Sequence, residues 1–145
     1  MKRNALLYVL LAIVGAAFSG CATGPKFGEI SGALPQLKSD SGRIYIYRTS
    51  ILGTAIQPDV KLDGQVVGSA KPKGFFYVDC APGSHQISSS TEVTRTLSLT
   101  LDAGQVRYVR LNISMGFLVG HVYPELVDPD QGKNDLAECS YIGAK

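Results

Sequence analysis

Hydrophobic and polar residues alternate in several short runs after residue 41. In the segment GRIYIYR, residues 42–48, Ile44 and Ile46 alternate with Arg43, Tyr45 and Tyr47. Alternation of this kind, with β-branched and aromatic residues, is typical of a β-strand.

Turn residues separate further apolar runs. In VKLDGQVVG, the pair Asp63 and Gly64 predicts a tight hairpin, because glycine accepts the positive φ that such turns need. FFYVDC predicts another strand, and a turn at Pro82 and Gly83 leads to a strand through Ile87. The segment TLSLTLDAGQVRYVRLNI alternates on both sides of a turn at residues 102–105 and predicts a second hairpin.

The last apolar run is GFLVGHVY, which we expect Pro124 to stop. Residues 128–145 predict either a helical turn through Leu136 or a short edge strand. No pattern after the first twenty residues predicts a helix of three or more turns. Seven or eight short strands with regularly spaced turns predict an all-β fold, an antiparallel β-sandwich over residues 42–145.

The first twenty residues have a different pattern. Lys2 and Arg3 precede an apolar run from Ala5 to Phe18, which is shorter than the roughly 20 residues needed to span a bilayer. This arrangement predicts a secretory signal peptide with a helical apolar core over residues 1–20, with an uncleaved anchor as the alternative. Residues 21–41, rich in Gly, Pro, Ser and Lys, predict a flexible tether whose latter part can dock on the domain.

The signal ends in Phe18, Ser19, Gly20 and Cys21, which resembles the bacterial lipobox. The resemblance implies that Cys21 becomes the lipidated first residue of the mature chain. Ala22 follows the cysteine, where retention at the inner membrane would favour aspartate. The expected location is therefore the cell envelope, at the periplasmic face of the outer membrane, with the membrane as partner through the lipid anchor.

The mature domain is neutral. Removing Lys2 and Arg3 from the 14 basic residues leaves 12, which equals the 12 acidic residues. A neutral domain without a basic run does not attract nucleic acid, so we expect no nucleic-acid partner. An envelope protein or peptidoglycan is the expected partner class.

The other two cysteines, Cys80 and Cys139, would face an oxidising compartment after export. A disulfide between them would close a loop of about 60 residues and stabilise the fold by roughly 4 kcal/mol. The alternative is that Cys80 is a buried small hydrophobic residue and Cys139 a free thiol.

The chain carries none of the sequence motifs that identify common catalytic sites. It contains no GxSxG, HExxH, CxxC or Walker phosphate loop, so we expect no enzyme activity, cofactor or metal. His85 follows the Pro82–Gly83 turn, and we expect it to cap that turn; His121 lies in an apolar run and is expected to be structural. The acidic stretch from Asp128 departs from a calcium loop at its sixth and twelfth positions.

A candidate ligand-binding set consists of large side chains with polar groups. These residues alternate with the isoleucines and leucines of two predicted strands, and tyrosine and arginine suit sugar or protein recognition. The alternative is that the tyrosines belong to the core or lie under the tether. The set is Arg43, Tyr45, Tyr47, Tyr108 and Arg110.

The segments GRIYIYR, VKLDGQVVG and VDCAPGSHQIS together resemble a family of small bacterial lipoproteins known only as a domain of unknown function. In that family a strand ends in tyrosine and arginine, a hairpin carries Val-Gly, and a turn reads Pro-Gly-x-His. The resemblance implies a secreted β-rich domain with a membrane anchor and implies no activity. The second and third segments also resemble surface-exposed modules of the PEGA kind, which suggests envelope scaffolding.

These patterns favour a membrane-anchored envelope lipoprotein that acts as a non-catalytic binding or assembly module. One alternative is a receptor for a small molecule or glycan on the tyrosine and arginine face. Another is an inhibitor or chaperone-like lipoprotein that captures exported proteins through an exposed edge strand.

Overall fold

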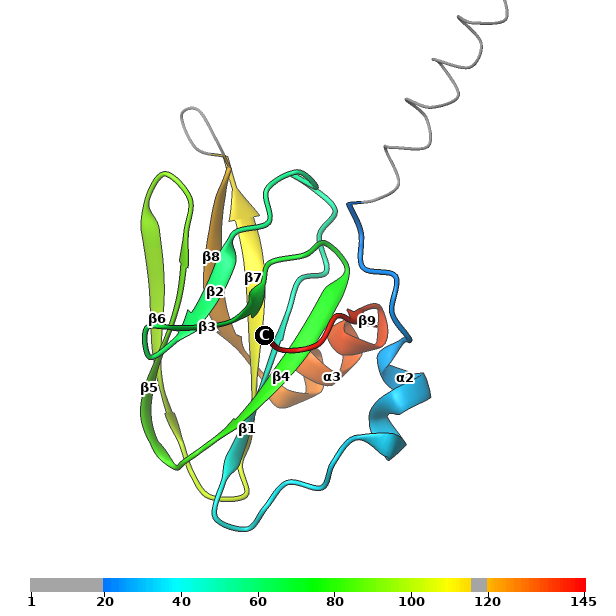
Figure 1. Cartoon of the computed structure of the whole chain (residues 1–145), viewed down its shortest axis with the longest axis vertical. Coiled ribbons are helices and arrows are strands. Elements are labelled where there is room, and N and C mark those ends of the chain that lie inside the picture. Colours follow the sequence, from blue (N-terminus) through cyan, green and yellow to red (C-terminus); the bar gives the residue numbers. More distant parts are fainter. Residues whose placement is uncertain (1–19, 116–119) are drawn as a thin grey trace, which may run out of the picture.

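The computed structural model describes residues 20–115 and 120–145 of the chain. Two β-sheets face each other, and two short helices cover the outer face of the larger sheet (Figure 1). Within the described residues, no helix is both long and apolar enough to cross a bilayer. The predicted signal peptide lies outside them, apart from its last residue, Gly20.

The five-stranded sheet has the order β8-β7-β1-β4-β9, and the four-stranded sheet has the order β3-β2-β5-β6. The larger sheet consists of β1 (Gly42–Tyr47), β4 (Gly74–Cys80), β7 (Val106–Ser114), β8 (His121–Val127) and β9 (Ser140–Tyr141). The smaller sheet consists of β2 (Asp59–Leu62), β3 (Gln65–Ser69), β5 (Gly83–Ser90) and β6 (Thr94–Leu101). The helices are α2 (Phe27–Ile30), the 3-10 turn η1 (Ser31–Ala33) and α3 (Pro129–Ala137).

The fold is mostly β and resembles a sandwich, but it is not purely antiparallel as predicted. β1 runs parallel to β7, and β4 runs parallel to β9, while the other pairs are antiparallel. A hairpin forces its two strands to run antiparallel, whereas β1 and β7 are separated by the whole of the smaller sheet. Alternation within one strand therefore could not indicate the direction of its neighbour.

The hydrophobic core between the two sheets is built from the alternating aliphatic residues. Ile44 and Ile46 are fully buried there and meet Val60, Ile87 and Leu101 from the facing sheet. Removing a large apolar side chain from water stabilises a fold by about 1.5–3 kcal/mol. The alternation in GRIYIYR thus predicted the inner face of β1.

The hairpin predicted at Asp63 and Gly64 is confirmed, and it joins β2 to β3. Both residues have positive φ, 50° and 85°. Positive φ at both central residues is the geometry of the tight turns that match the twist of a hairpin.

β8 departs from the predicted strand end. It does not stop at Pro124 but continues to Val127, and Pro124 pairs in register with Leu111 of β7. Proline lacks an N–H donor and is tolerated on an edge strand, where one side of the strand has no partner in the sheet. β8 is such an edge strand.

The acidic tail forms both of the elements that its sequence suggested. Asp128 caps α3 by accepting a hydrogen bond from the backbone N–H of Asp130 at 3.0 Å, and Pro129 begins the helix. Leu136, a residue of α3, is fully buried. The chain then forms the short strand β9. The residues compared with a calcium loop therefore form a capped helix.

The segment predicted as a flexible tether packs on the domain from its first residues. The N–H of Ala22 donates to the carbonyl of Pro72 at 2.9 Å. Phe27, Ile30 and Leu34 follow at helical spacing and pack against the outer face of the larger sheet.

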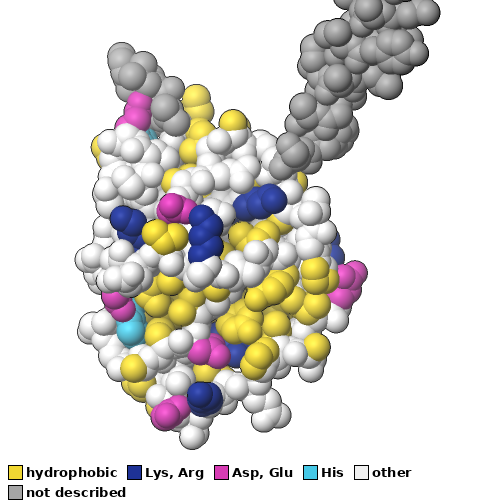
Figure 2. Space-filling view, in the orientation of Figure 1, with side chains coloured by type: hydrophobic (Ala, Val, Ile, Leu, Met, Phe, Trp, Pro, Cys, Tyr) yellow, Lys and Arg dark blue, Asp and Glu magenta, His cyan; other side chains and the backbone are white. Residues whose placement is uncertain are grey.

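Figure 2 shows basic and acidic side chains interspersed over one face of the molecule, with apolar side chains between them.

Gly132 lets α3 lie close against β7. A Cβ atom at this position would lie 2.4 Å from Cγ and 2.5 Å from Cβ of Tyr108, which is itself buried. We expect Gly132→Ala to lower the free energy of unfolding by about 1–3 kcal/mol, because the buried side chain of Tyr108 cannot move away from the added methyl group. Urea unfolding would measure it.

The matched control is Gly28→Ala in α2, where a Cβ would meet nothing within 4 Å. Alanine in a helix is favoured over glycine by roughly 0.5–1 kcal/mol, so this variant should be neutral or slightly more stable. Equal effects at both positions would contradict close packing at Gly132.

Candidate functional site

The candidate ligand-binding residues lie on one face of the larger sheet. We call this set, Arg43, Tyr45, Tyr47, Tyr108 and Arg110, the tyrosine–arginine face. The register places Tyr45 beside Tyr108, and Tyr47 beside Arg110. The rings of Tyr45 and Tyr108 stack with centroids 5.6 Å apart. Strand register thus brings together side chains more than 60 residues apart in sequence.

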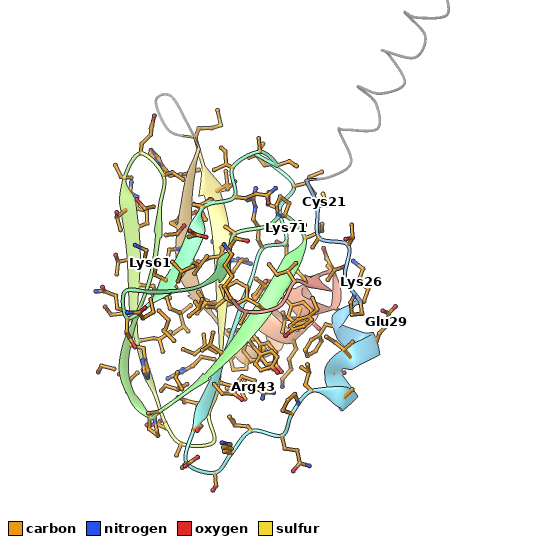
Figure 3. All side chains as sticks on the ribbon, in the orientation of Figure 1. Cys21, Lys26, Glu29, Arg43, Lys61 and Lys71 are labelled. Atoms are coloured by element: carbon orange, nitrogen blue, oxygen red, sulfur yellow. The ribbon has the colours of Figure 1, made fainter. Side chains whose placement is uncertain are left out.

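This face is covered, so it does not form the exposed binding patch that we considered. Tyr45, Tyr47 and Tyr108 are 7%, 1% and 6% exposed. Phe27 of α2 meets the ring of Tyr45 edge-on at 5.6 Å, and Leu136 of α3 joins the same cluster. The predicted alternative, that the tyrosines belong to the core beneath the N-terminal segment, describes the structure. Figure 3 shows how closely side chains fill the space between sheet and helices.

Arg43 ties the sheet to the N-terminal segment. Its guanidinium donates to both carboxylate oxygens of Asp79, at 2.6 and 2.8 Å, and to the carbonyl of Pro35 at 2.8 Å. It also lies 4.3 Å from the centroid of the Tyr77 ring. The hydrogen bonds to Asp79 raise the pKa of Arg43, so the group stays charged.

Asp135 links α3 to the sheet. Its carboxylate accepts from the hydroxyl of Tyr47 at 2.9 Å and from Arg110 at 3.3 Å. Arg110 also donates to Glu125 at 2.9 Å, which lowers the pKa of that carboxyl. Burial, followed by the bond to Asp135, raises the pKa of Tyr47. These hydrogen bonds fasten α3 to the sheet, and among these groups Nε of Arg110 is buried without a partner.

Sequence reasoning missed Asp79 and Asp135 as partners of this face. Asp79 is two residues from Tyr77 in FFYVDC, so alternation put both on one strand face, but the pairing of β4 with β1 was needed to set them beside Arg43. No local signal pointed to Asp135, because its partners lie 25 and 88 residues away.

Arg48 is fully buried and organises the loop of residues 49–57. Nη1 donates to the carbonyls of Ile56 and Ala70, both at 2.7 Å. Nη2 donates to the carbonyls of Leu52 and Gly53. No carboxylate among the described residues pairs with it, so four peptide dipoles stabilise the charge.

Cys21 lies at the same end of the molecule as this loop. The carbonyl of Gly20 accepts from the side chain of Gln57 at 2.9 Å, and Ala22 bonds to Pro72. Cys21 itself is half-buried, in the place labelled in Figure 3. The residue predicted to carry lipid is thus held directly against the domain.

The predicted disulfide between Cys80 and Cys139 is wrong in this structure, where both are free thiols. Cys80 ends β4, whereas Ser140, next to Cys139, pairs with Gly74 at the start of β4. Six residue steps of about 3.3 Å separate these ends by roughly 20 Å. A disulfide needs Cα atoms within about 7 Å. Burial raises the pKa of Cys139 to about 12, so its thiol is unreactive.

His85 joins two turns. Its Nδ1 lies 2.7 Å from a carboxylate oxygen of Asp63, and its Nε2 lies 2.8 Å from the carbonyl of Ala81, beside Pro82 and Gly83. Both partners are acceptors, and only the protonated imidazole donates from both nitrogens. The bond to Asp63 is the main cause that raises the pKa of His85 above its usual 6.5.

We expect this contact to make stability depend on pH. A raised folded-state pKa means that the stabilisation is complete below about pH 6.5 and is lost as pH rises through the folded value. His85→Gln should therefore lower the free energy of unfolding more at pH 6 than at pH 9, with a difference of about 1 kcal/mol or less, because Asp63 is half exposed. Thermal unfolding of both proteins at each pH would measure it, and an equal deficit at both pH values would contradict a protonated His85.

His121 begins β8 and lies near the turn between β5 and β6, with Nδ1 3.3 Å from the hydroxyl of Thr91 and Nε2 3.7 Å from Glu92. Within residues 20–115 and 120–145, no group of three histidine, cysteine or acidic side chains could hold a metal ion.

An open groove of about 410 Å³ lies where β6 approaches β8. Arg95 and Thr96 line one side, and Ser114, Tyr123 and Pro124 line the other. Its volume lies within the roughly 300–1,000 Å³ typical of small-molecule sites. The groove offers one arginine and one tyrosine to a ligand, in a place that the sequence did not suggest.

Comparison with known proteins adds two findings. Residues 38–122 match the family described as "Protein of unknown function (DUF2846)". An "Uncharacterized protein" from Haemophilus influenzae (strain ATCC 51907 / DSM 11121 / KW20 / Rd) is 31% identical over 142 residues, covering 92% of this chain and 84% of that protein. The family match begins shortly before β1 and ends at the second residue of β8, so it covers strands β1 to β7 but not most of β8, α3 or β9.

Proposed function

This chain belongs to the DUF2846 family, described as of unknown function, and from that premise we propose that it is a lipid-anchored envelope lipoprotein. Cys21 would carry the lipid and would hold the domain at the periplasmic face of the outer membrane. The domain would act as a non-catalytic binding or assembly module, whose local concentration near envelope partners the anchor raises.

The observation that carries this proposal is the position of Cys21. The cysteine follows an apolar run and two small residues in the sequence, and it lies half-buried at the surface one residue before the backbone joins the domain. Such a position leaves room for acyl chains without disturbing the core. The polar groups of Arg43, Tyr47 and Arg110 bond to carboxylates of the same chain, those of Asp79 and Asp135, which also favours a module over an enzyme.

Metabolic labelling tests the proposal. Growing bacteria that produce the protein would be fed radioactive palmitate, and the purified chain should carry the label at its mature amino terminus. A processed chain without label would overturn the proposal.

The groove at Arg95 and Tyr123 supports a second candidate function, a receptor for a small molecule or glycan. Tyrosine presents a flat apolar ring with a polar end, and arginine presents several donors, which suits a sugar. Purified peptidoglycan sacculi are the probe. The double variant Arg95→Ala, Tyr123→Ala should sediment with sacculi several-fold less than the wild type.

Lys61→Ala is a suitable control, because Lys61 is an exposed basic residue on β2, in the middle of the smaller sheet and away from the groove. It should leave sedimentation unchanged. Equal sedimentation of the double variant and the wild type would exclude the groove as the peptidoglycan site.

A further inference from the structure

One end of the sandwich carries most of the exposed large hydrophobic side chains. Seven such side chains are exposed among the described residues, and four of them belong to loops at this end. Monomeric domains expose such residues singly, whereas a cluster indicates a contact surface. The four are Met115 (84% exposed), Ile51 (61%), Leu52 (56%) and Val93 (42%).

Contacts at the ends of β7 and β8 join these loops into one surface. A Cβ atom on Gly53 would lie 3.0 Å from Cδ1 of Ile113, two residues before Met115. Ser114 pairs with His121, which reaches Thr91 at 3.3 Å, next to the turn that carries Val93. Figure 1 shows the loop after β1, the turn between β5 and β6 and the last residues of β7 at the end where residue 20 enters the domain.

The loop that carries Ile51 and Leu52 cannot easily turn these side chains inward. Arg48 binds the carbonyls of Leu52 and Gly53 from below. The hydroxyl of Thr54 donates to the carbonyl of Ile51 at 2.6 Å, and the N–H of Leu52 donates to the hydroxyl of Ser50 at 3.0 Å. The backbone is therefore held with both apolar side chains in solvent.

Cys21 belongs to the same end, and no flexible linker separates it from the domain. In the mature chain, which would begin at Cys21, the N–H of the next residue, Ala22, still donates to the carbonyl of Pro72 at 2.9 Å. Acyl chains on Cys21 would leave the domain at this end, so the bilayer would lie next to the loops. Lys71, beside Pro72, places a basic residue close to Cys21, as Figure 3 shows, which suits anionic lipid headgroups.

We propose that this end, which we call the anchor end (Cys21, Ile51, Leu52, Val93 and Met115), rests on the membrane with its apolar side chains in the boundary between headgroups and acyl chains. The inference relies on the proposed lipid anchor and adds a fixed orientation. The opposite end of the sandwich, with the turn between β6 and β7, would then face the periplasm.

Burial of apolar side chains in the interface favours this orientation over free rotation about the anchor. A protein partner could cover the same residues, and the experiment separates the two, because only lipid is supplied.

The chain has no tryptophan, so a single introduced tryptophan reports its own surroundings. The lipidated protein with Ile51→Trp would be reconstituted in vesicles of phosphatidylethanolamine and phosphatidylglycerol with brominated acyl chains. We expect a blue-shifted emission and loss of most of the intensity relative to vesicles without bromine. Val93→Trp, in a different loop of the anchor end, should behave in the same way.

The control is Ala103→Trp, an exposed position in the turn between β6 and β7, at the far end of β6 from Val93. Its emission should stay red-shifted and unquenched. Anchored protein whose tryptophans at 51 and 93 stay unquenched, as at 103, would overturn the orientation and leave the anchor intact. Protein that carries no lipid and stays in solution would overturn the proposed function and this inference together.

Discussion

Replacing Arg48 with methionine is expected to lower the free energy of unfolding by about 4 kcal/mol, the largest stability loss that we expect from a single substitution. The side chain of Arg48 is fully buried and donates hydrogen bonds to four backbone carbonyls. Each buried acceptor left without a donor costs about 1–3 kcal/mol.

Two effects oppose each other in this variant. Methionine removes a buried cation, which recovers part of the cost of taking the charge out of water. It also leaves four carbonyls without donors, of which those of Leu52 and Gly53 belong to a partly exposed loop that water can reach. The unsatisfied carbonyls outweigh the recovered desolvation, because methionine has no donor that could replace the guanidinium.

Equilibrium urea unfolding would measure the loss. Arg95→Met is the matched control, since Arg95 is exposed on β6 and its replacement should change stability by less than about 0.5 kcal/mol. A stability of Arg48→Met within 1 kcal/mol of the wild type would show that the bonds to the loop contribute little.

Replacing Cys21 with serine is expected to move the mature protein from the detergent phase to the aqueous phase almost completely. One acyl chain binds a membrane only marginally, and two or more chains hold firmly. Serine has no sulfur to form the thioether. The variant should be exported behind an ordinary cleavable signal, so that the apolar residues 5–18 do not remain attached.

Phase partitioning in a clouding detergent would measure the effect. Cys80→Ser is the matched control, because it makes the same change in another half-buried cysteine and should leave the protein in the detergent phase. Retention of Cys21→Ser in the detergent phase to the same extent as the wild type would exclude lipidation at this residue.

The strands and turns were predictable because their signals are local. Alternation in GRIYIYR predicted β1 and both of its faces, and the Asp63–Gly64 pair predicted the hairpin between β2 and β3. A period of two residues and a positive φ are properties of a few neighbouring residues, so the sequence carries them directly. The match to a family of unknown function was likewise expected from three short segments.

Contacts between distant residues were not predictable in this way. The apolar content of a face says that it must be covered, but not whether a ligand or the chain itself covers it. For the tyrosine–arginine face, α2 and α3 provide the cover, and Asp135 fastens α3 through Tyr47. The error over Cys80 and Cys139 has the same origin, because spacing along the chain does not report distance across a sheet.

The sequence by itself determined where the strands lie, which of their residues face inward, and which cysteine follows an apolar leader. Only the tertiary structure decided that β1 and β7 run parallel, that Arg48 gathers four carbonyls, and that Cys21 shares one end of the molecule with Ile51 and Leu52. The physical reason is how far apart along the chain the interacting residues lie. Backbone geometry and side-chain alternation act between neighbouring residues, whereas cover, charge compensation and surface clustering arise only when distant segments meet.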